Sequence, residues 1–230
     1  MNSELIKLYE SKWTLLSKEL GEINNDSTKE VKPANPLLLS VDNEFVNSDI
    51  KIMFIGQETN GWYESISSIE ELTKAYDDFY WSNRCYKRGG QFWNGVKLLK
   101  TLVQDKYPNK NISAIWNNVL KIGKAKGKNK PPQYIRSIEH DYFKVIQEEL
   151  KIIKPNVIIF LSGPYYDNII SEHFQVDKYA IDESVSVRKL ARLEIKGYKN
   201  CFRTYHPNNL YRSKNINQYF DAIVKEIKID

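Results

Sequence analysis

Cysteine is nearly absent from this chain of 230 residues, which contains only Cys85 and Cys201. Two cysteines are too few for a disulfide framework, an all-cysteine zinc site or a four-cysteine iron–sulfur cluster within the chain. Long apolar stretches are also lacking: no run approaches the roughly 18 residues that a membrane-spanning helix needs. The first seven residues have no signal-peptide core. We therefore expect a soluble, cytoplasmic protein that makes no use of a membrane.

The composition is that of an ordinary folded protein, with 41% hydrophobic and 27% charged residues, which excludes wholesale disorder. The length suits one large α/β domain, and we find no internal repeat and no linker. With 34 Lys and Arg against 29 Asp and Glu, the net charge is +5 and the pI is near 8.9. This charge permits a polyanionic partner without requiring one.

Short apolar runs alternate with segments of helical spacing. The runs are nearly continuous, which is typical of strands buried on both faces of a sheet. They cover residues 51–55, 112–116, 156–161 and 200–205. The helical segments cover residues 68–79, 92–102, 142–153, 165–174 and 216–227, with a further helix over 4–20.

This alternation predicts a parallel sheet, because parallel neighbours need crossover connections. We expect a single three-layer α/β/α domain over residues 1–230, with a central four-stranded parallel sheet and an extra N-terminal helical segment over about residues 1–32. Residues 185–195 fit an additional strand or hairpin. Residues 121–130, which contain five lysines and two glycines, fit a mobile loop.

Polar side chains follow the four predicted strands, at the edge where open parallel sheets bind ligands. Glu58 comes after the first strand, Asn117 and Asn118 after the second, and His206 after the fourth. A carboxylate, a histidine and two amides at one edge would combine acid/base chemistry with an amide that can read the edge of a heterocycle.

Each of these features is also compatible with an ordinary structural role. Residues 56–61 can be a tight turn, and the two asparagines can occupy another turn. His206 before Pro207 can be a structural histidine, and the lysine run can be a solvated loop. The functional interpretation therefore depends on the features occurring together and in order.

Five segments in the same order resemble motifs of the uracil-DNA glycosylase superfamily. Gly56-Gln57-Glu58 resembles the start of its first motif, G-Q-D-P-Y-H, and His206-Pro207-Asn208-Asn209-Leu210 resembles its closing motif, H-P-S-P-L. Residues 116–120 are similar to its L-N-T-V-L segment. Residues 90–99 and 150–163 resemble segments of the thermophilic branch, the first of which carries a base-stacking Phe.

Some positions differ from these motifs. Thr59 replaces a proline, Asn60 replaces a bulky tyrosine of one branch, and Asn208-Asn209 replaces Ser-Pro. The base-reading asparagine has two alignments. The uracil branch aligns Asn117, whereas an N-x-x-K form aligns Asn118 with Lys121.

The resemblance implies a hydrolase of base-excision DNA repair, which cleaves the N-glycosidic bond of uracil or a related damaged base. The base would be flipped into a pocket at the carboxyl ends of the strands. The resemblance implies that Glu58 stabilises the oxocarbenium-like sugar and positions water, and that a neutral His206 donates a hydrogen bond to the leaving base. Gln57, Phe92, Asn117 and Asn118 would bind the base.

The resemblance also implies how DNA is held. Leu210 would fill the vacated base stack, although a loop leucine packed inward accounts for it equally well. Arg212, Lys214 and some lysines of residues 121–130 would contact phosphates. We expect a monomer that acts on DNA containing uracil or a damaged base and needs no metal or other cofactor. The alternative is a catalytically silent relative that binds nucleic acid or a free base.

Overall fold

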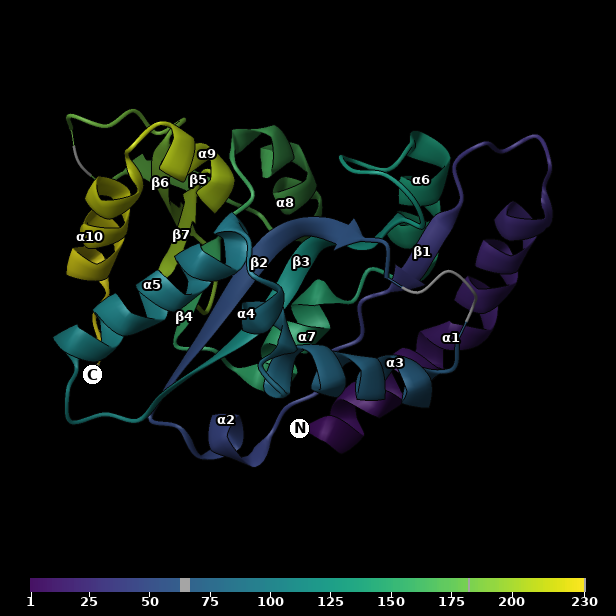
Figure 1. The fold of residues 1–230 in the computed structure, drawn as a ribbon, viewed down its shortest axis with the longest axis horizontal. Coiled ribbons are helices and arrows are strands. Elements are labelled where there is room, and N and C mark those ends of the chain that lie inside the picture. Colours follow the sequence, from purple (N-terminus) through teal and green to yellow (C-terminus); the bar gives the residue numbers. More distant parts are fainter. Residues whose placement is uncertain (63–66, 182, 230) are drawn as a thin grey trace. The chain divides into compact units, whose positions relative to one another are not determined.

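The computed structural model describes residues 1–62, 67–181 and 183–229. Its strands form a mixed sheet in the order β1-β3-β2-β4-β7-β6-β5 (Figure 1). The strands are β1 (Pro33–Pro36), β2 (Ile50–Asn60), β3 (Ile112–Lys124), β4 (Val157–Phe160), β5 (Asp177–Ala180), β6 (Leu190–Glu194) and β7 (Cys201–Thr204). The central strands β3-β2-β4-β7 are parallel, so the predicted α/β fold and its parallel core are confirmed.

The outer strands make the sheet mixed. β1 pairs antiparallel with β3, β6 pairs antiparallel with β7, and β5 pairs antiparallel with β6. The prediction of an extra strand or hairpin over residues 185–195 is confirmed by β6, whose hairpin partner is β5.

Each predicted helical segment overlaps a helix of the structure. The helices are α1 (Asn2–Asn25), α2 (Asn43–Asn47), α3 (Ile69–Tyr76), α4 (Arg84–Arg88), α5 (Gln91–Lys106), α6 (Gln133–Tyr142), α7 (Ile146–Ile153), α8 (Asp167–His173), α9 (Pro207–Arg212) and α10 (Ile216–Glu226), with a π-helical turn η1 (Asp77–Trp81) and a 3-10 turn η2 (Pro164–Tyr166). Among these helices of the described residues, the sequence does not predict α2, α4, α6 and α9. The predicted helix over 142–153 begins too early, because Tyr142 ends α6 and α7 starts at Ile146.

The chain divides into two compact units. The first comprises Met1–Val41, Gln57–Ser82 and Asn117–Ile153, and the second comprises Asp42–Gly56, Asn83–Trp116 and Lys154–Asp230. The expectation of a single domain over residues 1–230 stays a prediction.

In the first unit, α1 packs against α3, α6, α7 and β1 (Figure 1). The apolar stripe that makes this contact contains Leu5, Tyr9, Leu16 and Leu20, all buried. α3 starts at a capping box, in which Ser68 accepts from the Glu71 N–H and the Glu71 carboxylate accepts from the Ser68 N–H.

The predicted loop over residues 121–130 begins too early, because β3 continues through Lys124.

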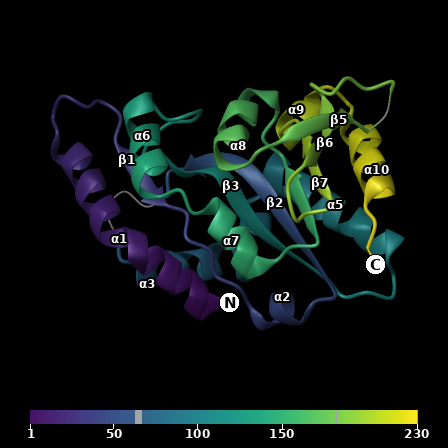
Figure 2. The same cartoon turned by 180° about the vertical axis from the view of Figure 1, so that it is seen from behind.

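In the second unit, apolar runs pair in register at the centre of the sheet. Ile52 of β2 lies opposite Val157 of β4, and Ile158 of β4 lies opposite Cys201 of β7. Residues 52–55 of β2 and all of β4 and β7 are buried, as their continuous apolar runs predict. α5 packs against α9 and α10 (Figure 2).

Candidate active site

His206 lies between β7 and α9, at the N-cap position of that helix. Its Nδ1 atom accepts a hydrogen bond from the backbone N–H of Asn208 at 3.1 Å. A ring nitrogen that accepts from an N–H carries no proton, so the neutral imidazole must hold its proton on Nε2. The cap therefore selects the tautomer in which Nε2 is a hydrogen-bond donor.

Burial also keeps this imidazole uncharged at neutral pH. It lowers the pKa of His206 from its ordinary value of 6.5 to about 4, because removal from water disfavours the charged form. A neutral imidazole with Nε2–H can donate to an oxygen on which negative charge develops, as the sequence predicts for His206.

Phe92 lies against His206. The two rings stack with their centroids 5.4 Å apart and an interplanar angle of 29°. Phe92 is the second residue of α5, and the close approach of α5 to α9 depends on Gly95. A Cβ atom at position 95 would lie only 2.7 Å from Cβ and Cγ of Pro207. Glycine at this position therefore lets the helix that carries Phe92 pack beside the residue that follows His206.

Asn117 and Asn118 lie inside β3 and not after it, which corrects the predicted strand end. Both are buried, with Asn117 wholly inaccessible to solvent. The Asn117 carboxamide is engaged at both ends: Nδ2 donates to Glu149 Oε2 at 2.9 Å, and Oδ1 accepts from Lys121 Nζ at 2.7 Å and from the Asn118 N–H at 2.8 Å. This arrangement disfavours Asn117 as the residue that reads a base.

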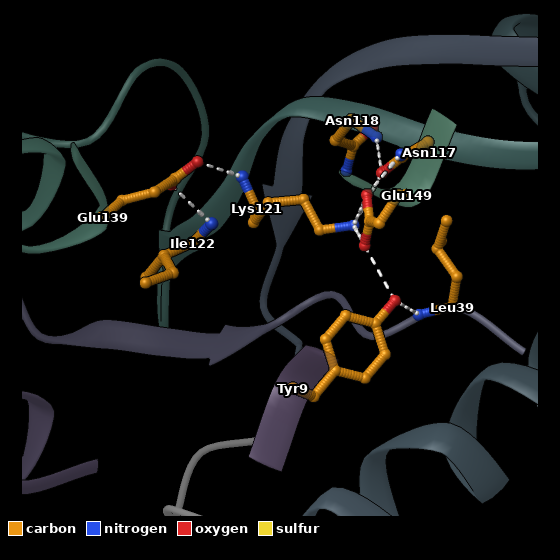
Figure 3. Close-up of polar contacts among 8 residues, drawn as sticks. All are labelled: Tyr9, Leu39, Asn117, Asn118, Lys121, Ile122, Glu139 and Glu149. Carbon is orange, nitrogen blue, oxygen red and sulfur yellow. Dashed lines mark hydrogen bonds and ion pairs between the residues drawn. The ribbon is translucent and has the colours of Figure 1, made fainter. Parts of the chain in front are cut away.

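Asn117 belongs to a buried network with Tyr9, Lys121 and Glu149, shown in Figure 3. Lys121 Nζ lies 2.8 and 3.1 Å from the two carboxylate oxygens of Glu149, and neither side chain is exposed. The Tyr9 hydroxyl donates to Glu149 Oε1 at 2.7 Å and accepts from the Leu39 N–H at 2.9 Å. We call these four side chains the buried network. It corrects the prediction that Lys121 belongs to a solvated loop.

Burial shifts the pKa values of Lys121 and Tyr9 in the network and of the neighbouring Glu139. It lowers the pKa of Lys121, while the nearby Glu149 carboxylate opposes the shift. It raises the pKa of Tyr9 well above its ordinary value, and the adjacent Glu149 carboxylate adds to this effect. Glu139 accepts the N–H groups of Lys121 and Ile122 at 2.7 and 2.9 Å, yet its burial raises the pKa of the carboxyl to about 7.

Gln57 and Glu58 lie within β2 and not in the turn expected after it, because the strand continues to Asn60. Both are half-buried. The neighbouring Thr59 is buried, and its Oγ1 accepts the N–H of Gly123 at 3.0 Å. A Cβ atom at Gly123 would meet the Thr59 carbonyl oxygen at 2.0 Å, so β3 needs glycine at this point. Thr59, which departs from the proline of the resembling motif, thus ties β2 to β3.

The residues predicted to hold DNA differ in exposure. Arg212 and Lys214 are exposed at the end of α9, where side chains can reach phosphates. Leu210 is wholly buried on the inner side of the same helix. This burial favours the alternative of a leucine packed inward, and a role of Leu210 in filling a vacated base stack stays a prediction.

The family model of the Uracil DNA glycosylase superfamily matches residues 44–228. The chain belongs to this superfamily. Its predicted family is thereby confirmed, and membership implies a DNA substrate and the N-glycosylase chemistry that most members perform. No curated protein sequence matches the chain.

The described part of this superfamily member offers neither a membrane span nor a cluster of metal ligands. Within the described ranges, no helix combines the length and apolarity needed to span a bilayer. Across residues 1–62, 67–181 and 183–229, no three His, Cys, Asp or Glu side chains gather as a group that would hold a metal ion.

Sequence reasoning missed Tyr9 and Glu149 of the buried network and the contact of Lys121 with Asn117, although the pattern carried a signal for each. Tyr9 continues the apolar stripe of α1 four residues after Leu5. Glu149 shares the buried face of α7 with Ile146 and Ile153, at helical spacing. Lys121 lies four residues after Asn117, so strand alternation puts both on one face of β3.

Proposed function

We propose that this protein is a DNA glycosylase of base-excision repair that hydrolyses the N-glycosidic bond of uracil or a related damaged base. The observation that carries the proposal is the state of His206, which is neutral and whose Nε2 bears the proton. Membership of the Uracil DNA glycosylase superfamily supplies the reaction class in which such a donor is useful.

Cleavage of the glycosidic bond leaves positive charge on the sugar and negative charge on the departing base. In the proposed reaction, the Nε2–H of His206 donates to a base oxygen and stabilises the anion. The Glu58 carboxylate, identified from the first motif, stabilises the sugar cation and orients the water that attacks its anomeric carbon. Water supplies the hydroxyl of the product sugar, and its remaining proton balances the charge of the released base.

Recognition of the base is proposed to use Asn118, with contributions from Gln57 and stacking by Phe92. Asn118 is the better of the two asparagines because the Asn117 carboxamide already binds Lys121 and Glu149. A carboxamide presents a donor and an acceptor, which match the O4 and N3–H edge of uracil and mismatch cytosine. Such a base must be flipped out of a duplex or lie in a single strand.

The experiment is a cleavage assay on DNA with one uracil, in single-stranded and double-stranded form, followed by alkali to break the chain at abasic sites. Wild-type protein should yield alkali-labile sites, and Glu58→Gln should lose most of the single-turnover rate while still binding the DNA. Glu70→Gln, which neutralises an exposed carboxylate of α3, is the control and should keep the wild-type rate.

Two results would contradict the proposal. If the wild type releases neither uracil nor other damaged bases yet binds DNA, the protein is a silent member of the superfamily. If the wild type is active and Glu58→Gln retains half or more of its rate, Glu58 is not the catalytic carboxylate.

A further inference from the structure

The buried network contains an ion pair between Lys121 and Glu149, and neither side chain is exposed to solvent. Such buried pairs add little to stability, because removing two charges from water costs free energy. Each charged group satisfies several partners at once. Glu149 accepts from Tyr9, Asn117 and Lys121 at 2.7 to 3.1 Å. The network is therefore satisfied internally, and its geometry is specified more tightly than a hydrophobic core would need.

One consequence of this geometry is a fixed orientation of the Asn117 carboxamide. Its oxygen faces the Lys121 ammonium at 2.7 Å, and its nitrogen faces the Glu149 carboxylate at 2.9 Å. A flipped carboxamide would place N–H against the ammonium and C=O against the carboxylate, so the charges on both sides select one orientation.

The oriented Asn117 in turn holds the next residue of β3. Its Oδ1 accepts the backbone N–H of Asn118 at 2.8 Å. Successive side chains of a strand point to opposite faces. The Asn117 side chain therefore lies on the face of β3 that contacts the network, and the Asn118 side chain lies on the opposite face. Because the Asn117 carboxamide binds the Asn118 N–H, it also fixes the backbone that carries the Asn118 side chain.

Tyr9 provides a contact to this network from outside the family match. It belongs to α1, whereas the superfamily model covers residues 44–228. The Tyr9 hydroxyl bonds Glu149 on one side and the Leu39 N–H on the other, and Leu39 also precedes the matched range. Figure 3 shows this hydroxyl between the Glu149 carboxylate and the backbone of Leu39.

We propose that Tyr9 is a positioning residue for base recognition, which acts through Glu149 and Lys121 to hold Asn117 and, through it, Asn118. The N-terminal helix is thus part of the recognition apparatus and not an appendage. This inference rests on the proposed glycosylase function and adds to it a residue that lies outside the family motifs.

The test is Tyr9→Phe, which removes one oxygen and keeps the ring that lies 6.1 Å from Phe143. The matched control is Tyr134→Phe. Tyr134 also donates its hydroxyl to the N-terminal segment, at 2.6 Å from the Val31 carbonyl oxygen, which is not part of the buried network. Each variant loses the hydrogen bond that one buried or half-buried tyrosine hydroxyl donates. Both variants are assayed well below the lower of their two melting temperatures.

Tyr9→Phe should lower the single-turnover rate at uracil about tenfold, because the loss of one hydrogen bond to a charged group is of that size. Its affinity for DNA with a preformed abasic site should not change, because that DNA has no base to read. Tyr134→Phe should match the wild type in both measurements. A purely structural Tyr9 would lower the melting temperature and leave the rate at uracil unchanged, which would overturn the inference.

Amide hydrogen exchange provides a readout that does not depend on catalysis. Exchange at the Asn117 side-chain amide and the Asn118 N–H should be at least about tenfold faster in Tyr9→Phe than in Tyr134→Phe. Equal exchange in the two variants would overturn the inference even if the wild type were inactive. An inactive wild type with faster exchange in Tyr9→Phe would overturn the proposed function alone.

Discussion

Lowering the pH should protonate His206 only near pH 4, far below the range of an ordinary histidine. The difference between its ordinary pKa of 6.5 and the folded-state value of about 4 is about 2.5 pH units. At about 1.4 kcal/mol for each unit, protonating this imidazole costs about 3 kcal/mol more in the folded protein than in the unfolded chain. The ring is only half-buried, so solvent screening makes this value an upper limit.

The sign of the effect on stability follows from the lowered pKa. The contribution of His206 is fully present above pH 6.5 and is lost as the pH falls from 6.5 toward 4. Glu139 acts in the opposite direction, because its pKa is raised from 4.5 to about 7 and the folded state therefore takes up a proton first as the pH falls. The pH dependence of the wild type alone mixes both contributions.

A variant separates the two contributions. His206→Asn places an amide oxygen where Nδ1 caps α9, so the helix cap is kept and the titrating ring is removed. Between pH 7 and pH 4, urea unfolding should show that the wild type loses up to about 3 kcal/mol relative to His206→Asn. The variant should also lose about 10²–10³ in cleavage rate, the usual effect of removing one donor to a developing anion.

Nitrogen NMR of the imidazole rings tests the same reasoning directly, and the chain has only three histidines to assign. The His206 signals should identify the Nε2–H tautomer and titrate with a midpoint near 4. A midpoint near 6.5, or a proton on Nδ1, would refute the idea that the cap and burial together prepare this histidine as a donor.

The other predictions concern packing, the buried pair and DNA binding. Lys121→Met should lower the free energy of unfolding by about 3–5 kcal/mol because it strands the Glu149 carboxylate, and adding Glu149→Gln should recover part of that loss in chemical denaturation. Gly95→Ala should cost about 1–3 kcal/mol by overpacking α5 against α9, and should slow cleavage more than it weakens DNA binding. Arg212→Ala should reduce the slope of log affinity against log salt by about one unit, whereas Leu210→Ala should lower stability by about 2–5 kcal/mol and leave that slope unchanged.

The core of the sheet could be predicted because its signal is local. The residues of β4 are buried without exception, and a short, continuous apolar run such as Val157–Phe160 is typical of a strand covered on both faces. The ends of β2 and β3 could not be predicted in this way, because polar residues continue both strands. Thr59 in β2 and Asn117 in β3 stay in the sheet because their side chains find partners that lie far away in the sequence.

The motifs propose residue types for the candidate site, but the contacts of those residues do not follow from the sequence. His206 was identified from its place after a strand and from its motif, but its tautomer depends on the N–H of Asn208, which only the folded N-cap geometry supplies. Leu210 shows the opposite case. Its motif position predicted an exposed wedge, whereas the spacing within α9 turns it inward and leaves Arg212 exposed.

In the lysine-rich segment, residue type alone does not show which lysines are exposed to solvent and which are buried. The sequence of residues 121–130 predicts one solvated loop, yet the first of these lysines is wholly buried in β3 and neutralised by Glu149, 28 residues away. Lys126 and Lys128, beyond the strand, are exposed beside Gly127 and Asn129, both of which have positive φ. If this segment contacts phosphates, these later lysines are the ones exposed to do so, whereas Lys121 binds Asn117 of β3. Neutralising Lys126 and Lys128 should weaken binding to all DNA alike, whereas a change at Lys121 should alter the reading of the base.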